Sequence, residues 1–318
     1  MVEDAPGEDA PGEDPPRDGR AGIDAALVRR LIAAQFPRWR DLPVTPVEVD
    51  GWDNRTYRLG AELTVRLPTA EGYAPAIAKE HRWLPALAPH LPLPVPPIVA
   101  RGAPGEGYPF AWSVRGWLDG EVATAERVRD MGGFARDLAA FLRALWRVDA
   151  TGGPLAGAHS FYRGAPCAHY DGETRRALAA LAGRSDAGID AERAAAVWRD
   201  ALDATWRGTP VWFHGDIAVN NLLVRDGALA AVIDFGTSGV GDPACDLVIA
   251  WTLFTGAARE AFAHGVGQDE GTWARARGWA LWKAAICLEA ALDTDPAEAA
   301  HHRRVIGEVL ADHAAHAP

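Results

Sequence analysis

The stretch Val211–Leu247, VWFHGDIAVNNLLVRDGALAAVIDFGTSGVGDPACDL, decides the fold of this chain. Its short apolar runs predict three strands, at Val211–Phe213, Asn221–Val224 and Leu229–Ile233. Arg225–Asp226–Gly227 predicts a tight hairpin turn between the second and third of them. The segment is therefore expected to form a small β unit that carries polar residues in its loops.

The polar residues of this stretch have an informative spacing. Asp216 precedes Asn221 by five residues, and Asp234 follows the hairpin within an Asp-Phe-Gly sequence. The hairpin is expected to bring Asn221 and Asp234 near each other. Phosphoryl transfer requires a carboxylate that orients and deprotonates a hydroxyl, and oxygen ligands that hold Mg²⁺ on nucleotide phosphates. The segment supplies both, so a kinase is the leading hypothesis.

These motifs resemble those of the aminoglycoside phosphotransferase family, which comprises small-molecule kinases similar in fold to protein kinases. The resemblance covers roughly residues 44 to 310, and a His-Gly-Asp loop replaces the His-Arg-Asp of protein kinases. The matching residues are His214, Gly215, Asp216, Asn221, Asp234, Phe235, Gly236 and the run Gly241–Leu247. The resemblance implies a catalytic base at Asp216, Mg²⁺ ligands at Asn221 and Asp234, and a structural acid at Asp246. It also implies ATP or GTP as the phosphate donor.

The nucleotide side of the resemblance departs from the usual pattern. Arg66 takes the place of the strand lysine that contacts nucleotide phosphates, and Glu80 is its partner on the next helix. Arginine grips phosphate with two donors, so this replacement is not conservative. The alternative is that Arg66 and Glu80 form only a surface ion pair, worth less than about 1 kcal/mol.

Two further segments are expected to contact the nucleotide. Backbone N–H groups of Trp52, Asp53 and Asn54 lie in the turn where a kinase places its phosphate-covering loop. The alternative is an ordinary Asp-Gly hairpin turn, since Gly51 is the only glycine there. The backbone from Arg115 to Trp117 takes the place of the hinge that bonds the edge of the base.

Strands, one helix and further strands, followed by mostly helix, predict an α+β, two-lobed, protein-kinase-like fold. A small N-terminal β-sheet lobe with one key helix binds the nucleotide, at residues 21–118. A larger, mainly helical lobe at 119–318 carries catalysis and acceptor binding. Residues 1–20 are acidic and proline-rich and are expected to be disordered.

Hydrophobic periodicity places the individual elements. Strands are predicted at Val44–Val49, Thr56–Leu59, Leu63–Leu67 and Ala111–Leu118. Helices are predicted at Asp24–Phe36, Ala74–Leu87, Met131–Val148, Gly172–Ala182, Asp190–Trp206, Asp246–Ala263, Gly271–Leu292 and Pro296–His316.

Composition narrows the class of protein. With 318 residues, 48% hydrophobic and 24% charged, the chain is typical of soluble globular proteins. The longest uncharged stretch, Trp83–Ala100, contains six prolines and predicts no membrane span. Three unclustered cysteines and the lack of a secretory signal favour a cytoplasmic location. The net charge of −11 argues against a nucleic-acid surface and is compatible with a small, cationic acceptor.

Several other polar residues of the sequence have an expected role or position. His214 is expected to hold the loop, since Asp216 already supplies the base. Asp242 and Asp246 are expected to support the loop or to cap backbone N–H groups. Asn220 is expected to point away from the metal, because neighbouring strand residues alternate. Acids near the C-terminal helices either face a cationic acceptor or lie on a solvated surface: Glu289, Asp293 and Asp295. His301 and His302 are expected on the surface.

The acceptor stays open at this stage. An aminoglycoside-like molecule is the first hypothesis, and a macrolide, choline, homoserine or a sugar is an alternative. A non-catalytic nucleotide-binding module is a third hypothesis, which the intact Asp216, Asn221 and Asp234 argue against. The atypical Arg66 and the sparse glycine loop keep it open. Nothing in the sequence defines the oligomeric state.

Overall fold

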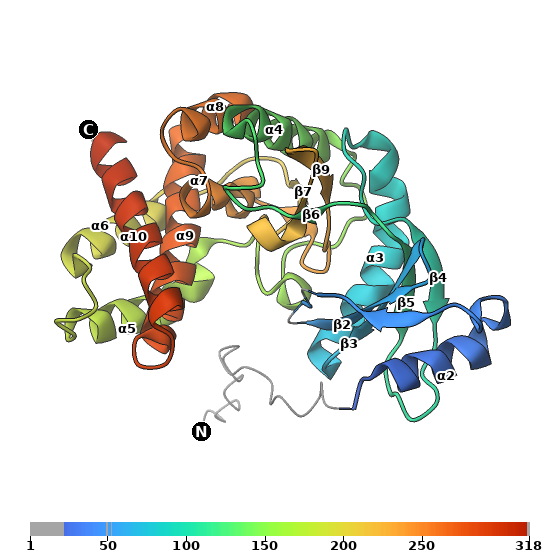
Figure 1. Ribbon diagram of the computed structural model, residues 1–318. Coiled ribbons are helices and arrows are strands. Elements are labelled where there is room, and N and C mark those ends of the chain that lie inside the picture. Colours follow the sequence, from blue (N-terminus) through green and yellow to red (C-terminus); the bar gives the residue numbers. More distant parts are fainter. Residues whose placement is uncertain (1–21, 49, 52, 317–318) are drawn as a thin grey trace, which may run out of the picture. The chain divides into compact units, whose positions relative to one another are not determined.

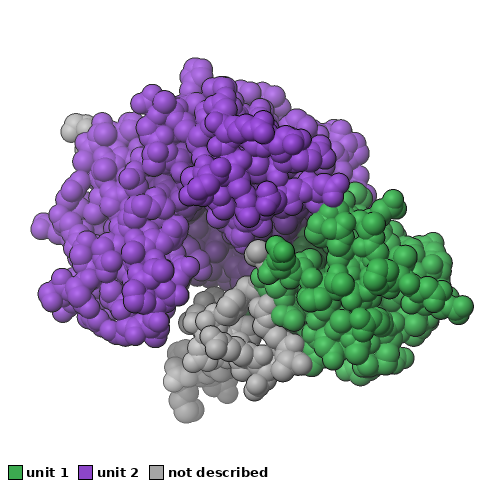
Figure 2. All heavy atoms as spheres, in the orientation of Figure 1, with its two compact units in different colours: residues 1–82, 97–117 green, residues 83–96, 118–318 purple. Residues whose placement is uncertain are grey.

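The computed structural model describes residues 22–48, 50–51 and 53–316. The predicted disordered tail at 1–20 and the predicted phosphate contact at Trp52 lie outside these residues. The chain forms two compact units, coloured separately in Figure 2. Unit 1 contains residues 1–82 and 97–117, and unit 2 contains residues 83–96 and 118–318.

Unit 1 is built on a five-stranded antiparallel sheet with the order β1-β2-β3-β5-β4 (Figure 1). Its strands are β1 (Val44–Pro46), β2 (Asn54–Leu59), β3 (Leu63–Pro68), β4 (Ile98–Gly102) and β5 (Trp112–Gly116). Its helices are α2 (Ala25–Gln35) and α3 (Ala74–Leu87). Only the part of α3 up to Arg82 belongs to this unit. The first strand is shorter than predicted, since it ends at Pro46.

The two faces of this sheet differ in chemistry because strand residues alternate between them. Val65 in β3 and Val114 in β5 are fully buried in the apolar core that α2 shares with the sheet. The next residues, Arg66 and Arg115, point to the opposite face, where both approach Glu80 of α3. The period of two thus gives unit 1 one apolar and one charged internal face.

Unit 2 contains two small antiparallel sheets. The first has the order β6-β8-β9, and the second pairs β7 with β10. Their bounds are β6 (Glu121–Val122), β7 (Val211–Phe213), β8 (Leu222–Arg225), β9 (Ala228–Val232) and β10 (Gly239–Gly241). The predicted hairpin is confirmed, with Arg225 opposite Ala228 at its turn.

The strand predicted at Asn221–Val224 begins one residue later than expected. Asn221 ends a 3₁₀ turn, Val219–Asn221, and β8 begins only at Leu222. The turn forms because the Asn221 N–H donates to the Ala218 carbonyl at 2.9 Å. Asn220 lies in this turn and is exposed, so the strand alternation on which its predicted direction rested does not apply.

The rest of unit 2 is helical. Its helices are α4 (Met131–Arg147), α5 (Asp171–Ala182), α6 (Ala191–Asp203), α7 (Ile249–Thr252), α8 (Gly256–Val266), α9 (Glu270–Ala291) and α10 (Pro296–His316). α9 packs against α5, α6 and α10 and is buried along most of its length. Among the described residues, no helix is both long and apolar enough to cross a membrane.

The single helix predicted at Asp246–Ala263 is wrong. A 3₁₀ turn at Pro243–Leu247 leads into α7, and α8 starts separately at Gly256. The backbone breaks because Thr255 is extended, with φ −139° and ψ 157°, and Gly256 follows with φ +47°. A positive φ is incompatible with a continuing right-handed helix.

Candidate active site

The loop of His214, Gly215 and Asp216 follows directly after β7 in unit 2. Gly215 has φ +86°, and a Cβ built there would lie 2.9 Å from the Thr237 carbonyl oxygen. Only glycine fits both the backbone conformation and this close approach. The Thr237 hydroxyl also donates to the His214 carbonyl oxygen at 3.0 Å. The loop is therefore packed tightly against the segment that follows Asp234.

Asp246 supports this loop through hydrogen bonds to its backbone. Its fully buried carboxylate accepts hydrogen bonds from the N–H groups of His214 at 2.9 Å and Gly215 at 2.7 Å. Burial raises the pKa of the Asp246 carboxyl above its ordinary value, while these two N–H donors act in the opposite direction. The expected loop-supporting role is thus what the side chain does.

The neighbouring Asp242 has a different role. It accepts from the Ala244 N–H at 3.1 Å and forms a buried pair with Arg275 of α9, with 2.6 Å between Nε and Oδ2. Burial raises the pKa of Asp242, and Arg275 opposes this shift. The pair ties the segment that carries Asp246 to the central helix.

The hydrogen bonds of His214 define which of its two ring nitrogens carries the hydrogen. Its Nδ1 lies 3.2 Å from the Asp216 N–H, which is a donor, and its Nε2 lies 3.0 Å from the Ile233 carbonyl, which is an acceptor. Nδ1 therefore accepts and Nε2 carries the hydrogen, as in a neutral imidazole. Both ring nitrogens are used within the protein, so His214 holds the loop and is not available as a base.

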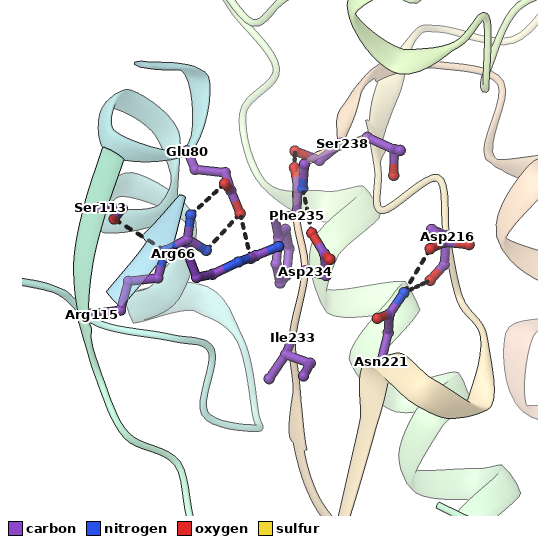
Figure 3. Close-up of polar contacts among 12 residues, drawn as sticks. Arg66, Glu80, Ser113, Arg115, Asp216, Asn221, Ile233, Asp234, Phe235 and Ser238 are labelled. Atoms are coloured by element: carbon purple, nitrogen blue, oxygen red, sulfur yellow. Dashed lines mark hydrogen bonds and ion pairs between the residues drawn. The ribbon is translucent and has the colours of Figure 1, made fainter. Parts of the chain in front are cut away.

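Asp216 is exposed and is held by Asn221. The Asn221 Nδ2 donates to the Asp216 Oδ2 at 2.7 Å and to the Asp216 carbonyl oxygen at 3.0 Å (Figure 3). Among the described residues, no donor bonds the other carboxylate oxygen, Oδ1. An oriented carboxylate with one oxygen open is what abstraction of a hydroxyl proton requires.

Asn221 also fits the predicted metal site. Because both acceptors on Asp216 require its nitrogen, the amide orientation is defined and Oδ1 points away from them. The Ile233 N–H donates to the Asn221 carbonyl oxygen at 2.9 Å, so the strand that ends at Asp234 runs beside Asn221. The predicted proximity of Asn221 and Asp234 follows from this pairing.

Asp234 itself has an unusual backbone. Its φ is +62°, a conformation that non-glycine residues rarely adopt, and its Oδ1 accepts from the Gly236 N–H at 3.3 Å. Phe235 is buried with its ring edge against His214, 4.6 Å between centroids, and Ser238 donates to the Phe235 carbonyl at 2.7 Å. Phe235 thus anchors this segment in the core, and the Asp234 carboxylate stays outside the core.

The donor set suits Mg²⁺. Among the described residues no group of three or more His, Cys, Asp or Glu side chains forms a metal cluster. The amide oxygen of Asn221 and the carboxylate of Asp234 are two hard oxygen ligands. Magnesium on a nucleotide takes one or two protein ligands and completes its shell with phosphate oxygens and water. A sparse oxygen set therefore fits this ion, whereas a zinc site would require more protein ligands.

The predicted nucleotide residues of unit 1 form a buried charged cluster (Figure 3). The side chains of Glu80 and Arg115 are each 1% exposed, and that of Arg66 is 11% exposed. Arg66 lies 3.7 Å from Glu80, whereas Arg115 donates to both Glu80 oxygens, at 2.9 and 2.5 Å. Arg66 and Glu80 are thus not a surface pair. The prediction for Arg115 concerned only its backbone, although a charged residue within the apolar strand sequence WSVRG was a signal for a buried ion pair.

The other nucleotide residues are placed as follows. The Asp53 carbonyl accepts from the Thr69 N–H at 2.9 Å, and Asn54 is buried with its Oδ1 lacking a donor among the described residues. Arg115 lies within β5 between β3 and β4, so its backbone faces neighbouring strands. The Trp117 N–H donates to the Glu62 carbonyl at 2.7 Å. These backbone groups therefore have partners within unit 1.

The acids proposed for a cationic acceptor have partners inside unit 2. Glu289 pairs with Arg176 at 3.0 Å, and Asp293 pairs with Arg184 at 2.8 Å. Asp295 accepts from the N–H groups of Ala297 and Glu298 at the start of α10. Each acid thus has a structural role in the helical region.

A loop that the sequence did not single out lies beside the catalytic loop. Pro154 accepts from the Val240 N–H at 2.8 Å, and Gly164 accepts from the Asp242 N–H at 2.9 Å, so the loop runs along β10. The two residues Phe161 and Tyr162 have φ of +47° and +52°. The Tyr162 ring stacks on His169 with 3.4 Å between centroids. The loop is thus held by backbone hydrogen bonds along β10 and by the stacking of Tyr162 on His169.

A family model described as "Phosphotransferase enzyme family" matches residues 44–279. No curated protein matches the chain. The GDP complex of wild-type aminoglycoside 2'-phosphotransferase-IIIa is 17% identical, with a TM-score of 0.68 over 91% of this chain and 99% of that chain.

Two other solved structures extend this comparison. The ternary complex of streptomycin, ATP and APH(2")-IIa is 16% identical, with a TM-score of 0.57 over 92% of this chain and 97% of that chain. Macrolide 2'-phosphotransferase MphH from Brachybacterium faecium is 27% identical, with a TM-score of 0.55 over 90% of this chain and 97% of that chain. These likenesses confirm the predicted α+β, protein-kinase-like fold.

Proposed function

The chain belongs to the phosphotransferase enzyme family, and on this premise we propose that it moves the γ-phosphate of ATP or GTP to a hydroxyl of a small molecule with the help of Mg²⁺. It is a phosphotransferase with an alcohol group as acceptor. The observation that carries the proposal is the pairing of Asp216 with Asn221, at 2.7 Å from Nδ2 to Oδ2. A non-catalytic nucleotide-binding module has no use for an exposed carboxylate held in this way.

The residues of the site have separate tasks in this mechanism, and Asn221 has two. Asp216 accepts a hydrogen bond from the acceptor hydroxyl through its open Oδ1 and takes the proton as the oxygen attacks the γ-phosphorus. The bond from the γ-phosphorus to the bridging oxygen breaks in the same step, and the nucleoside diphosphate leaves. Asn221 orients Asp216 through its nitrogen and offers its oxygen, with the Asp234 carboxylate, to Mg²⁺. The ion supplies charge neutralisation on the β- and γ-phosphates when it is bound. His214, Gly215 and Asp246 keep the loop rigid, so that Asp216 needs little reorganisation.

On the nucleotide side, Arg66 contacts phosphate oxygens, and Glu80 lies beside it. Support comes from the buried position of the cluster, where a charge–phosphate contact is weakly screened by solvent. The backbone N–H groups of Asp53 and Asn54 are the candidate phosphate donors in the preceding loop. A neighbour of this fold binds GDP and another binds ATP, so both ATP and GTP are candidates for this chain.

The acceptor has two candidates. An aminoglycoside-like, cationic acceptor has support from the aminoglycoside kinases among the fold neighbours. A macrolide-like acceptor has support from the 27% identity to a macrolide 2'-phosphotransferase.

The decisive experiment is a nucleotide-consumption screen with ATP and GTP across aminoglycosides, macrolides and metabolite alcohols. The wild-type protein is compared with Asp216→Ala at each acceptor. The proposal expects product formation that needs Mg²⁺, an acceptor and Asp216. Turnover that survives in Asp216→Ala would contradict the assigned base. Nucleotide binding without any transfer across the screen would favour the binding-module hypothesis.

A further inference from the structure

A buried ion pair joins α9 to the segment that follows β10. The side chains of Arg275 and Asp242 are only 6% and 3% exposed. Arg275 donates through Nε to Asp242 Oδ2 at 2.6 Å and through Nη2 to Oδ1 at 3.2 Å. In the part of the chain that the structure describes, no other cation pairs with Asp242. The carboxylate depends on this partner, because an uncompensated charge in the interior is strongly unfavourable.

The guanidinium of Arg275 is itself fixed by further contacts. Its Nη1 donates to the Ala204 carbonyl, directly after α6, at 3.2 Å. Its Nη2 also donates to the Thr272 hydroxyl oxygen at 3.1 Å, one turn earlier in α9. A planar group that donates in several directions to buried acceptors has a single orientation. Asp242 is therefore held against a fixed point of the helical region.

Asp242 in turn begins the short turn that contains Asp246. Asp242 is the N-cap of the 3₁₀ turn Pro243–Leu247, and its Oδ1 accepts from the Ala244 N–H at 3.1 Å. Asp246 lies within the same turn and is fully buried. The direction in which the turn starts thus determines where the Asp246 carboxylate lies.

Asp246 holds the backbone of the catalytic loop. Its two oxygens accept from the N–H groups of His214, at 2.9 Å, and Gly215, at 2.7 Å. The next residue along the chain is Asp216. A continuous series of hydrogen bonds therefore leads from Arg275 to the residue before the proposed base.

We propose that Arg275 is a positioning residue of the catalytic loop: by fixing Asp242, it sets the Pro243–Leu247 turn where Asp246 reaches the loop backbone. The proposal rests on the proposed function, in which Asp216 is the base. Without Arg275, the Asp242 carboxylate would take up a proton or turn toward water, since no cation would compensate it. Either change alters the cap of the turn, so that Asp246 and the loop shift.

Arg275→Met should lower kcat by about 10²-fold, because a displacement of about 1 Å at a reacting group costs about that much in rate. KM for the nucleotide should stay close to the wild-type value, since the backbone that Asp246 holds supplies no proposed nucleotide or Mg²⁺ ligand. The N–H groups of His214 and Gly215 should exchange with solvent faster than in the wild type, because their acceptor has moved.

Arg277→Met is the matched control. Arg277 lies two residues further along α9, its side chain is 5% exposed, and it pairs with Glu270 and, at 3.0 Å, with Asp312. Removing it breaks a comparably buried ion pair, but its partners belong to α9 and α10 and not to the segment that holds the loop. Arg277→Met should therefore lower stability, with wild-type kcat and wild-type exchange at His214 and Gly215.

The double variant Arg275→Met with Asp242→Asn separates positioning from packing. Asparagine still caps the turn and carries no charge that needs a cation. The double variant should recover part of kcat and of the exchange protection, whereas a packing defect at position 275 would persist in it. If Arg275→Met does not fold, Arg275→Lys replaces it, since lysine keeps the charge but not the two-bond geometry. It should show the same loss of kcat in smaller size.

Turnover is measured by nucleotide consumption on full-length preparations that circular dichroism shows to be folded, and amide exchange by mass spectrometry of a peptide that contains His214 and Gly215. Lower kcat and faster exchange in Arg275→Met than in Arg277→Met, with recovery in the double variant, support the proposal. Values equal to those of Arg277→Met, or a double variant as impaired as the single one, overturn it. If the wild-type protein transfers phosphate to no acceptor, the proposed function fails, and the exchange rates alone decide the role of Arg275.

Discussion

The amide nitrogen of Asn221 lies 2.7 Å from a carboxylate oxygen of Asp216 and 3.0 Å from the Asp216 carbonyl oxygen. One side chain is thereby fixed in orientation by the candidate base, and its oxygen is left for the candidate metal. Base and metal ligand are coupled through a single amide. Substitutions at Asp216 and at Asn221 are therefore expected to differ in their effects on turnover and on Mg²⁺-dependent nucleotide binding.

Asp216→Asn should remove proton abstraction while preserving shape. The amide cannot take a proton, and general-base catalysis contributes about 10²–10⁴ in rate, so turnover should fall by that factor. Nucleotide affinity should change little. Turnover is measured by nucleotide consumption with an acceptor found in the screen. Asp226→Asn, in the exposed hairpin turn, is the control and should retain wild-type turnover.

Asn221→Asp and Asn221→Ala should separate the two tasks of this residue. The aspartate keeps an oxygen ligand for Mg²⁺ but loses the donor and places a like charge beside Asp216. It should therefore retain Mg²⁺-dependent nucleotide binding and lose turnover by roughly 10²-fold or more. The alanine should lose both. A thermal-shift titration with Mg²⁺ and nucleotide, run beside a turnover assay, checks this; identical behaviour of the two variants would contradict a metal-ligand role.

His214→Ala should damage the loop more than the chemistry. It leaves the part-buried Ile233 carbonyl and the Asp216 N–H without their His214 partner, at a cost of about 1–3 kcal/mol in the free energy of unfolding. The remaining turnover should exceed that of Asp216→Asn, because the base is still present. Urea denaturation and turnover are measured on the same preparations. A rate loss as large as that of Asp216→Asn, with wild-type stability, would assign His214 a chemical role.

Asp246→Asn should destabilise unit 2. One amide oxygen cannot accept as two carboxylate oxygens do, and the amide NH₂ would meet a backbone N–H donor of His214 or Gly215. The expected loss in the free energy of unfolding is about 2–4 kcal/mol. Urea denaturation measures it, with Asp226→Asn as the control. An unchanged midpoint would mean that the loop does not depend on these hydrogen bonds.

The sequence predicts the spatial arrangement of the loop and hairpin residues well because its signals are local. Asp216, Asn221 and Asp234 lie within one loop, one turn and one hairpin, so spacing alone determines their proximity. Gly215 was expected only as part of the matching motif, and the structure adds the positive φ of +86° that favours glycine there.

The helical region was less predictable because its contacts are distant in sequence. Arg176 reaches Glu289 across 113 residues, and Arg184 reaches Asp293 across 109, so acids that looked available are paired. Arg115 reaches Glu80 across 35 residues, and only packing of α3 on the sheet reveals the pair. The helix break at Gly256 had one weak signal, a lone glycine, which helices also tolerate.

His81, which lies beside the charged cluster of Arg66, Glu80 and Arg115, makes the stability of the protein depend on pH. Burial, followed by the cations Arg115 and Arg101, lowers the pKa of His81 to about 4, and Glu80 acts in the opposite direction. In the folded protein the neutral ring accepts a hydrogen bond from the Ser113 hydroxyl. In the unfolded chain the same imidazole takes a proton below about pH 6.5.

The sign of the effect follows from these two values. Between about pH 6.5 and pH 4 the unfolded chain binds the proton and the folded protein does not, so the free energy of unfolding falls as the pH falls. Below about pH 4 both states are protonated and this loss stops growing. Because His81 is only half-buried, solvent screening reduces the effect to about 1–2 kcal/mol.

His81→Asn removes the titrating group and keeps a side chain that bonds Ser113. Urea denaturation at pH 7.5 and pH 4.5 should show a smaller acid-induced loss in the variant than in the wild type, by about 1–2 kcal/mol. His90→Asn, at an exposed position, should lose as much as the wild type. Since His301 and His302 also have lowered pKa values from burial, only the difference between wild type and variant reports on His81. Equal acid sensitivity in wild type and His81→Asn would show that His81 is already solvated in the folded protein.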